Sequence, residues 1–328
     1  MFRAFFAGIF MLPSVVFATC SGEDLRTGLT DGQAAEISAR VAEMPYTEGN
    51  LWRASKEDQT IHLIGTVHIS DPRLDPVTDR LAPLIEQAEL MLVEASEEDM
   101  KKLEGAAATN PGLFFLSKGP SLIEQMGDEA WAPIAQAAAD RGIPGFMAAK
   151  MQPWYLAVTL GLPPCVIAEM RIAKPNGLDQ RLLRLAKEKN LPTESIEPYD
   201  TVFTIFNAIP LEAQVEMLSL GALPTDAAEN ALATLMNQYF EEKHAEVIEV
   251  SRVTARDLLD LSAEEIDAAF DQFLDLLLTQ RNARWMETLE AIEADDLVVA
   301  VGAGHLSGET GLLYLLEQDG YTLERLPF

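Results

Sequence analysis

The stretch Leu63-Ile64-Gly65-Thr66-Val67-His68-Ile69-Ser70 decides the fold, because an apolar strand runs into a glycine and a histidine there. The pattern returns near the other end of the chain, as Val301-Gly302-Ala303-Gly304-His305-Leu306-Ser307. In each copy the strand is followed by glycine, two residues, histidine, an aliphatic residue and serine. Since α/β proteins bind ligands at strand ends, the repeat predicts that His68 and His305 meet at one site.

The segments around both copies predict an α/β fold. Apolar residues at three-and-four spacing predict a helix over 71–88, between strands at 60–67 and 90–93, which makes a parallel βαβ unit. The chain end repeats this order, with strands at 296–301 and 321–326 around a helix at 308–318. We therefore expect a central mixed, largely parallel sheet built from N- and C-terminal strand–helix–strand halves, with a large helical insert between them.

The insert, at about 97–292, is rich in Ala, Leu and Glu, and it lacks the alternation that marks strands. We expect one short strand within it at 193–196 and helix breaks near Pro210, Pro224 and Thr254. A strand at 51–54 is expected to form a hairpin with 60–67. The remaining predicted helices are at 31–44, 121–141, 148–161, 178–189 and 201–292.

The first residues resemble an export signal rather than part of a fold. A short cationic start precedes an apolar run to Phe17, and small residues stand where a signal peptidase cleaves. We expect residues 1–18 to be a signal peptide, removed after Ala18, and residues 19–328 to form a single domain with no membrane span. The alternative, a lipid anchor on Cys20, is less expected because the residues before it match a lipobox poorly.

Composition limits the partners and the compartment. The net charge of −28 and a pI near 4.4 disfavour nucleic acid and anionic membranes as partners. Cys20 and Cys165 are the two cysteines, and export of a chain with an even number of them suggests a disulfide. We therefore expect a periplasmic or secreted protein in which these residues pair, although two separate thiols are the alternative. The sequence leaves the oligomeric state open.

A carboxylate completes the predicted site. Glu94 follows the strand at 90–93, so it is expected at the same sheet edge as His68 and His305. Two imidazoles and a carboxylate suit Zn, Mn, Fe or Co, with positions left open for water. Glu94 would act as a ligand or a general base. The alternative is a structural role for each residue, with Glu94 solvated near a helix start.

Local details of the two loops also lead to expectations. Gly65 would allow a sharp turn through its tolerance of positive φ. Ser70 and Asp71 after the first motif, and Ser307 in the second, are candidate N-caps of the following helices. The other two histidines are not expected at the site: His62 is read as structural, within its strand, and His244 as part of a solvated helix face.

Several signatures of other enzyme classes are missing from the sequence. It contains no His-Glu-x-x-His, Cys-x-x-Cys, P-loop or Gly-x-Ser-x-Gly motif. The glycines from Gly302 nearly match a dinucleotide fingerprint, but the 20 residues after Gly308 leave almost no room for the required acidic residue. Nucleotide binding and Ser-His-Asp chemistry are therefore unsupported.

The two glycine–histidine motifs resemble those of the TraB/GumN family, which includes the Tiki and pheromone-shutdown proteins. The resemblance runs from about Gly49 to the chain end. It extends to Gly320-Tyr321-Thr322-Leu323-Glu324, Lys150-Met151-Gln152-Pro153-Trp154, Gly177-Leu178-Asp179 and Gln280-Arg281-Asn282-Ala283-Arg284-Trp285. It implies an α/β fold related to the erythromycin-esterase and ChaN-like group.

The resemblance also implies chemistry, since Tiki members are described as metal-dependent proteases that use Mn or Co. Carried over by motif, the metal ligands are His68, His305 and Glu94. Arg281, matching the family's Arg-Asn element, or Arg284 would stabilise an oxyanion or hold a substrate carboxylate, and Glu94 would be ligand or base. For both arginines the alternative is ion pairing with acidic side chains. The residues considered for substrate binding are Asn282, Arg284 and Glu197.

The resulting hypothesis is an exported metal-dependent hydrolase, with a peptidase as the expected kind, Mn or Co as the expected metal and Zn as an alternative. Two other functions stay open. One is a binding protein that sequesters a peptide or haem without catalysis, and the other is a metal-independent esterase with a histidine as general base. The sequence does not identify the substrate.

Overall fold

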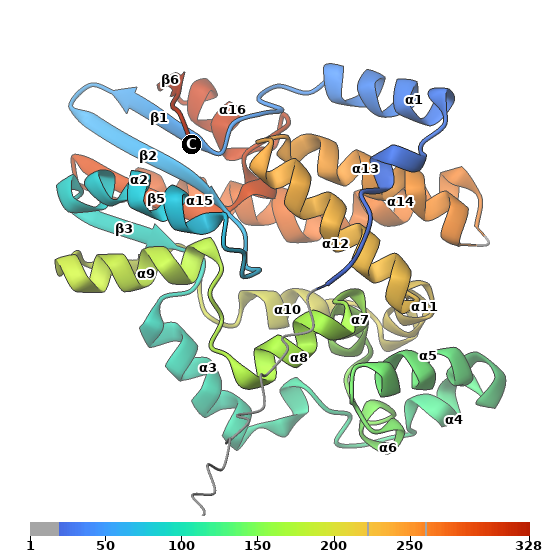
Figure 1. Cartoon of the computed structure of the whole chain (residues 1–328). Coiled ribbons are helices and arrows are strands. Elements are labelled where there is room, and N and C mark those ends of the chain that lie inside the picture. The colour runs from blue at the N-terminus through green and yellow to red at the C-terminus, as the bar shows by residue number, and fades with distance from the viewer. Residues whose placement is uncertain (1–19, 222, 260) are drawn as a thin grey trace, which may run out of the picture.

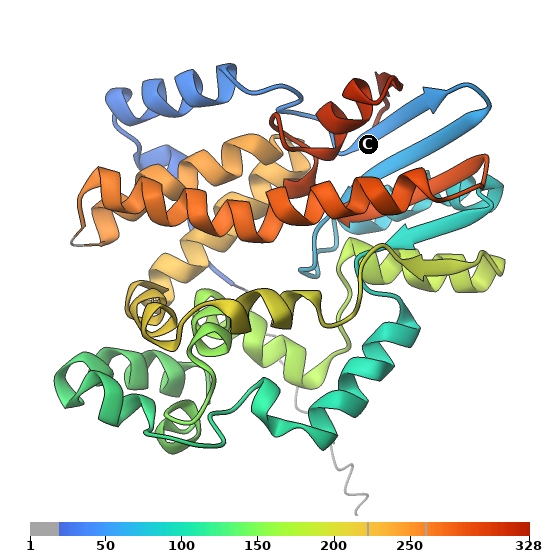
Figure 2. The ribbon, with the colours of Figure 1, turned by 180° about the vertical axis from the view of Figure 1, so that it is seen from behind.

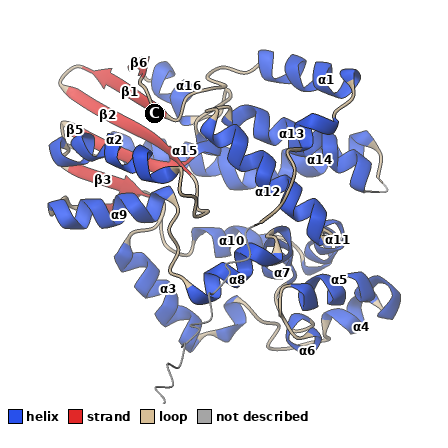
Figure 3. Cartoon of the chain, viewed as in Figure 1, coloured by secondary structure: helices blue, strands red, loops and turns tan. Residues whose placement is uncertain are grey.

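The computed structural model describes residues 20–221, 223–259 and 261–328, so the predicted signal peptide lies outside the described residues. Its centre is a six-stranded sheet in the order β4-β3-β5-β2-β1-β6 (Figures 1 and 3). The strands are β1 (Leu51–Lys56), β2 (Gln59–Thr66), β3 (Leu90–Val93), β4 (Thr193–Ser195), β5 (Asp296–Gly302) and β6 (Thr322–Arg325).

Four adjacent strands run in parallel. β5 pairs in parallel with both β2 and β3, and β3 pairs in parallel with β4. β1 is antiparallel to β2 and to β6, so the sheet is mixed and the predicted hairpin is present. The C-terminal strand β5 thus lies between the two strands of the N-terminal βαβ unit, which joins the two halves in one sheet.

The sequence of β5 explains its central place. Five consecutive residues from Leu297 to Val301 are buried, as expected for a strand covered on both faces. Val298 and Ala300 pack with α2 (Leu74–Gln87) and α9 (Leu178–Lys189) on one face of the sheet. The other face packs against α15 (Gln280–Glu290) and α16 (Leu312–Gln318), and Figure 2 shows α15 lying across it.

The helical region fills most of the chain between β3 and β5 and lies beyond the ends of the parallel strands (Figure 1). An N-terminal helix, α1 (Asp31–Ala42), packs against it. The helices of the helical region beyond the strand ends are α3 (Glu97–Thr109), α4 (Leu122–Met126), α5 (Asp128–Asp140), α6 (Gly145–Ala148), α7 (Pro153–Gly161), α8 (Pro164–Ile172), α10 (Thr201–Ala208), α11 (Leu211–Gly221), α12 (Thr225–Phe240), α13 (His244–Leu258) and α14 (Ala263–Leu274).

Several expected helix boundaries were wrong. The helix expected at 148–161 begins only at Pro153, which occupies the first helical turn, because Met151 bridges to Phe115. The helix expected at 121–141 breaks at Gly127, whose φ of 79° is outside the helical range. No break occurs at Thr254, since its hydroxyl donates back to the Val250 carbonyl within α13.

The expected N-caps were also wrong. α2 begins at Leu74 rather than near Ser70, because Asp71 accepts a hydrogen bond from the Arg73 backbone N–H and forms a turn first. α16 begins after Gly311 rather than after Ser307. Both histidine loops are therefore longer than predicted, because each following helix begins several residues later than expected.

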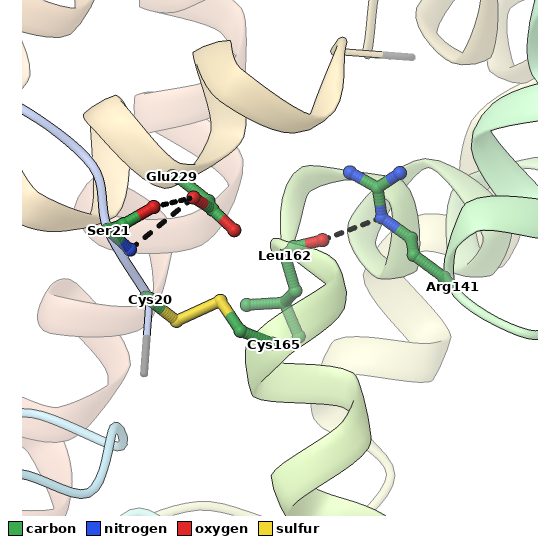
Figure 4. The surroundings of a disulfide bond; sticks show 6 residues. All are labelled: Cys20, Ser21, Arg141, Leu162, Cys165 and Glu229. Carbon is green, nitrogen blue, oxygen red and sulfur yellow. Dashed lines mark hydrogen bonds between the residues drawn. A yellow bond between two sulfur atoms is a disulfide. The ribbon is translucent and has the colours of Figure 1, made fainter. Parts of the chain in front are cut away.

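The predicted disulfide is confirmed. Cys20 and Cys165 are bonded, which joins the start of the described chain to α8 (Figure 4). The next residue, Ser21, donates to Glu229 of α12 from both its backbone N–H and its hydroxyl. In the described part of the chain, no single helix has the length and apolarity to cross a membrane, although the bent pair α7 and α8 passes that test jointly.

Candidate functional site

The carboxyl ends of the four parallel strands bring the predicted residues to one edge. In the order of the strands, Glu197 follows β4, Glu94 follows β3, His305 follows β5 and His68 follows β2. Neighbouring strands lie about 4.8 Å apart, so residues placed just after their ends fall within reach of one another. The topology, rather than closeness in sequence, therefore assembles the site.

The glycines of the two motifs are needed for close packing. A Cβ on Gly65 would lie 2.9 Å from Leu306 Cδ1 and 3.1 Å from Ala303, so the second loop packs directly on the first. Gly65 does not have a positive φ, so the expected reason for this glycine was wrong. Gly302 also lies close to Glu94, since a Cβ on it would be 3.2 Å from Glu94 Oε1. The Gly302 N–H donates a hydrogen bond to the same oxygen at 2.7 Å.

Arg281 of α15 occupies the middle of the cluster. Its Nη2 donates to Glu94 Oε2 at 2.6 Å and to Glu197 Oε1 at 2.5 Å, and its Nε donates to both Glu197 oxygens. Its Nη1 lies 3.2 Å from His305 Nε2. Arg281 is only 5% exposed to solvent, so the cation and two carboxylates form a buried network rather than a surface ion pair.

Asn282 fixes the orientation of the His305 ring. His305 Nδ1 lies 2.6 Å from Asn282 Oδ1, while the Asn282 amide donates to the backbone carbonyls of His305 and Thr310. Because the amide nitrogen is engaged by two carbonyls, Oδ1 faces the ring and the ring proton lies on Nδ1. The Nε2 lone pair then faces Arg281 and Glu94, whose Oε1 is 4.0 Å away. Trp285 packs on the ring, with centroids 4.2 Å apart.

Burial and nearby charges determine the ionisation of His305 and Glu94. Burial and the nearby Arg281 cation lower the pKa of His305 to about 3, despite the opposing effect of Glu94. Burial alone would raise the pKa of Glu94, but the charges of His305, Arg281 and His68 and the Gly302 N–H bring it down to about 2. At neutral pH the site therefore presents an ionised carboxylate beside a neutral imidazole.

His68 is the exposed member of the site. Its side chain is 66% exposed, and its Nδ1 lies 3.3 Å from Asp179 Oδ1 at the start of α9. This carboxylate raises the pKa of His68 to about 9. A Cβ on Gly177 would lie 2.4 Å from the His68 backbone, and the Leu178 N–H donates to the Val67 carbonyl. The Gly177-Leu178-Asp179 motif thus holds the first histidine loop, a role that the sequence prediction missed.

The other predicted residues differ in their placement. Glu197 is buried on Arg281 and also accepts a hydrogen bond from Trp285 Nε1 at 3.0 Å, so its oxygens are already engaged. Asn282 is engaged with His305, as described above. Arg284 is exposed and has no described contact with the cluster. Among the residues that the structure describes, no three His, Cys, Asp or Glu side chains converge closely enough to hold a metal ion.

The two remaining histidines have different surroundings. His62 lies half-buried within β2, as predicted. The prediction for His244 was wrong, because the side chain is buried at the start of α13 and its Nε2 lies 3.1 Å from the Tyr46 carbonyl oxygen. Burial lowers the pKa of His244 to about 4. Its acidic sequence neighbours suggested a solvated face, but the packing of the N-terminal segment covers this helix end.

Comparison with known proteins identifies the family. The profile of the TraB/PrgY/gumN family matches residues 50–325. The chain belongs to this family. The match begins at the first strand of the sheet and ends in the last, so it includes every residue of the cluster and confirms the resemblance seen in the two glycine–histidine motifs.

Curated relatives of this TraB/PrgY/gumN protein carry no assigned activity in their names. It is 24% identical over 257 residues to the uncharacterized protein YbaP of Escherichia coli (strain K12), and equally to that of Shigella flexneri. Each alignment covers 78% of this chain and 87% of the relative. The relatives thus support the family and leave the function to be argued from the site.

Proposed function

We propose that this family member is an exported metal-dependent hydrolase that cleaves peptides. The observation that carries the proposal is the orientation of His305, whose Nε2 lone pair faces the Glu94 carboxylate while Nδ1 is held by Asn282. Histidines that bind metals commonly donate their other ring N–H to a carbonyl or carboxylate in this way.

The donor chemistry fits a divalent ion. His68, His305 and Glu94 supply two imidazoles and a carboxylate, a set that suits Mn, Co or Zn once His68, whose pKa is about 9, releases its proton to the solvent. Asp179 Oδ1, which lies 3.3 Å from His68 Nδ1, adds a buried carboxylate oxygen beside this set. A bound ion would lower the pKa of its water and polarise a carbonyl. The side chains must rearrange to hold one, because no three of them converge as described.

The residues of this chain divide the remaining work. Glu197 accepts hydrogen bonds from both Arg281 and Trp285, and these contacts fix the Arg281 guanidinium at the site. To stabilise negative charge on a carbonyl oxygen during acyl transfer, Arg281 would have to release one of its acceptors, because Glu94, Glu197, His305 and the Leu277 carbonyl engage its five N–H groups. The Gly302 N–H and Arg281 each hold one oxygen of Glu94, which keeps this carboxylate at the sheet edge. The disulfide supports the export part of the proposal, since such bonds persist in oxidising compartments.

The test is metal content and peptide cleavage by the purified mature protein. After incubation with Mn²⁺ or Co²⁺ and gel filtration, we expect bound metal that is lost in His68→Ala and His305→Ala but retained in His62→Gln, a histidine control within β2. Cleavage of unstructured casein should stop with EDTA and return with the metal. Unchanged metal content in both site variants would refute the proposal.

One observation favours a second candidate, a metal-independent esterase. Arg281 Nη1 lies 3.2 Å from His305 Nε2, so a protein cation already occupies the neighbourhood that a metal would need. In this case Arg281 would leave His305 Nε2 and donate to the oxyanion, and the freed Nε2 of His305 would serve as general base. Hydrolysis of p-nitrophenyl esters that survives EDTA and is lost in His305→Ala would identify this activity.

A further inference from the structure

The exposed apolar side chains are concentrated in one part of the helical region. Among the residues that the structure describes, nine large apolar side chains are exposed, and six of them lie between residues 115 and 172. Val158 and Met170 line a cavity between α7–α8 and α12–α13, whereas Phe146, Met147 and Ile172 do not. Phe146 of α6 is 78% exposed and Ile172 of α8 is 65% exposed. Because a soluble protein rarely gathers such side chains in solvent, this concentration indicates a contact surface.

The same stretch differs from the rest of the chain in charge. Residues 141–174 contain one acidic residue, Glu169, and four basic residues, Arg141, Lys150, Arg171 and Lys174, so their net charge is +3. The chain as a whole has 52 acidic and 24 basic residues. At that average of roughly one acidic residue in six, a stretch of this length would hold about five. Acidic side chains are therefore depleted in the part of the chain where apolar side chains are most exposed.

Arg171, next to Ile172, connects α8 to the turn before α6. Its Nη2 donates to the Arg141 carbonyl at 2.8 Å and to the Gly142 carbonyl at 3.2 Å. A Cβ on Gly142 would lie 2.5 Å from Arg171 Nη1, so the contact is close. α6 begins three residues later, at Gly145, and Figure 1 shows α6 and α8 on the lower side of the molecule, away from the sheet. The exposed residues there form what we call the α6–α8 face: Phe146, Met147, Lys150, Arg171, Ile172 and Lys174.

We propose that the α6–α8 face docks on the surface of an anionic lipid bilayer. Phe146, Met147 and Ile172 would enter the headgroup region, while the cations beside them contact lipid phosphates. This inference goes beyond the proposed function and does not depend on it. The net charge of −28 disfavours anionic membranes for the chain as a whole, but exposed charges more than about 8 Å from the contact are largely screened at physiological ionic strength. The charge of +3 on residues 141–174 therefore determines the attraction at the contact.

Two observations favour a bilayer over a protein partner. The first is that α7 and α8 together have the length and apolarity of a membrane segment, although they are bent by 99°. Trp154, Leu156 and Leu160 of α7 are buried inside the protein. The pair therefore fits a position on a membrane rather than across it.

The second observation is the place where the chain enters the fold. Cys20, the first described residue, is bonded to Cys165 of α8. The apolar run of the expected signal peptide ends at Phe17, three residues earlier. Three residues span at most about 11 Å, so a chain whose apolar run is still in the membrane would hold α8 at the membrane surface. A protein partner gives no such reason for a basic, apolar face beside the export segment.

The test is sedimentation of the full mature protein with sucrose-loaded vesicles, in EDTA so that no metal takes part. One set of vesicles contains phosphatidylethanolamine and phosphatidylglycerol, and the other contains phosphatidylcholine alone. Phe146→Ser/Ile172→Ser removes apolar contacts of the face, and Lys150→Gln/Lys174→Gln removes two of its charges. All four side chains are exposed, so the fold should tolerate both double variants. Arg171 stays in place in every variant because it holds the turn before α6.

The matched control is Leu258→Ser/Phe273→Ser. These apolar side chains are 50% and 41% exposed on α13 and α14, outside the α6–α8 face. The control therefore removes a similar amount of exposed apolar surface without changing the proposed contact.

We expect the parent protein to bind the anionic vesicles. Binding should fall when NaCl is raised from about 0.1 M to about 1 M, because the Debye length shortens from about 10 Å to about 3 Å. Phe146→Ser/Ile172→Ser should weaken binding at least about tenfold, since burying one large apolar side chain favours binding by about that factor. Lys150→Gln/Lys174→Gln should weaken binding to the anionic vesicles severalfold and leave binding to phosphatidylcholine unchanged. The control should bind like the parent.

No sedimentation of the parent protein with the anionic vesicles would overturn the inference, and so would equal losses in the Phe146/Ile172 variant and the control. A dimer in analytical ultracentrifugation that Phe146→Ser/Ile172→Ser abolishes, with no vesicle binding, would overturn it in favour of a second copy of the chain as the occupant. The assay involves neither metal nor peptide cleavage, so its result is separate from that of the proposed function.

Discussion

Arg281 is the residue on which the candidate site depends most. One guanidinium serves two carboxylates, Glu94 and Glu197, and also contacts His305. The side chains of Arg281 and Glu197 are only 6% and 7% exposed, so neither charge can be hydrated well if its partner is removed. The asymmetry between breaking such a pair and replacing it whole gives a sharp prediction.

Replacing Arg281 with methionine should lower the free energy of unfolding by about 3–5 kcal/mol, because a buried carboxylate is left without its cation. The double variant Arg281→Met/Glu197→Gln should recover much of this loss, since the second buried charge is removed too. Arg284→Met, on the exposed side of the same helix, should change stability by less than about 0.5 kcal/mol. Urea denaturation measures all three, and an additive double variant would contradict the buried network.

His244 predicts a pH dependence. Its pKa is about 4 in the folded protein, below the ordinary 6.5, so the unfolded chain binds more protons between these values. Stability contributed by neutral His244 is complete above pH 6.5 and is lost as the pH falls toward 4. The loss should approach about 3 kcal/mol, at about 1.4 kcal/mol per pH unit.

The measurement is the unfolding free energy of the protein and of His244→Gln at pH 7.5 and pH 4.5. The glutamine amide can donate to the Tyr46 carbonyl but does not titrate, so the variant should lose less stability on acidification than the parent. Other groups titrate equally in both proteins and cancel in the difference. Identical acid dependence would place His244 in a less buried setting than the one described.

At the scale of elements, the start of α9 and the loop after β2 form one unit. Gly177 leaves no room for a Cβ against the His68 backbone, and Leu178 N–H donates to the Val67 carbonyl at 2.8 Å. The start of α9 thus fixes the position of the first histidine loop. Asp179 then orients the His68 ring, because its Oδ1 lies 3.3 Å from His68 Nδ1. The second loop is fixed separately, by Asn282 of α15.

Gly177→Ala should therefore displace the His68 loop and reduce activity or metal binding more than tenfold while the protein stays folded. Gly105→Ala in α3 is the matched control, because a Cβ there meets nothing within 4 Å. That control should stabilise the helix by up to about 1 kcal/mol. Thermal unfolding and metal content, measured on both variants, separate the two effects; equal behaviour would contradict the close approach.

At the scale of the whole molecule, the N-terminal segment connects α8 to α12. The disulfide fixes it to α8, and Ser21, Glu23 and Leu25 form hydrogen bonds with side chains of α12 (Figure 4). Gly22 lies against the Glu229 backbone, where a Cβ would be only 1.9 Å from the carbonyl oxygen. These contacts tie α8 and α12 together through the N-terminal segment.

Removing the disulfide should lower stability by about 2–5 kcal/mol, because the bond closes a loop of 145 residues in the unfolded chain. Cys20→Ser and Cys165→Ser should have the same effect as dithiothreitol. Urea denaturation measures the loss, and a reduced protein as stable as the oxidised one would contradict this prediction.

Much of the sheet could be predicted from sequence. The strand at 90–93 and the helix at 178–189 match the structure, because apolar runs and three-and-four spacing reflect burial that is local in the chain. The exact helix starts and breaks were harder to predict. The helix starts after Ser70 and Ser307 and the break at Gly127 depend on backbone geometry that periodicity does not record.

The sequence by itself determined that His68, Glu94 and His305 follow strands, since those strands are read from adjacent apolar residues, and it pointed to Cys20 and Cys165 as partners. Only the tertiary structure decided that Arg281 lies between Glu94 and Glu197, 187 and 84 residues away. It also decided that His244 is buried. The reason is physical: which face a helix turns inward can be read locally, but which charge it meets there depends on how distant helices pack on the finished sheet.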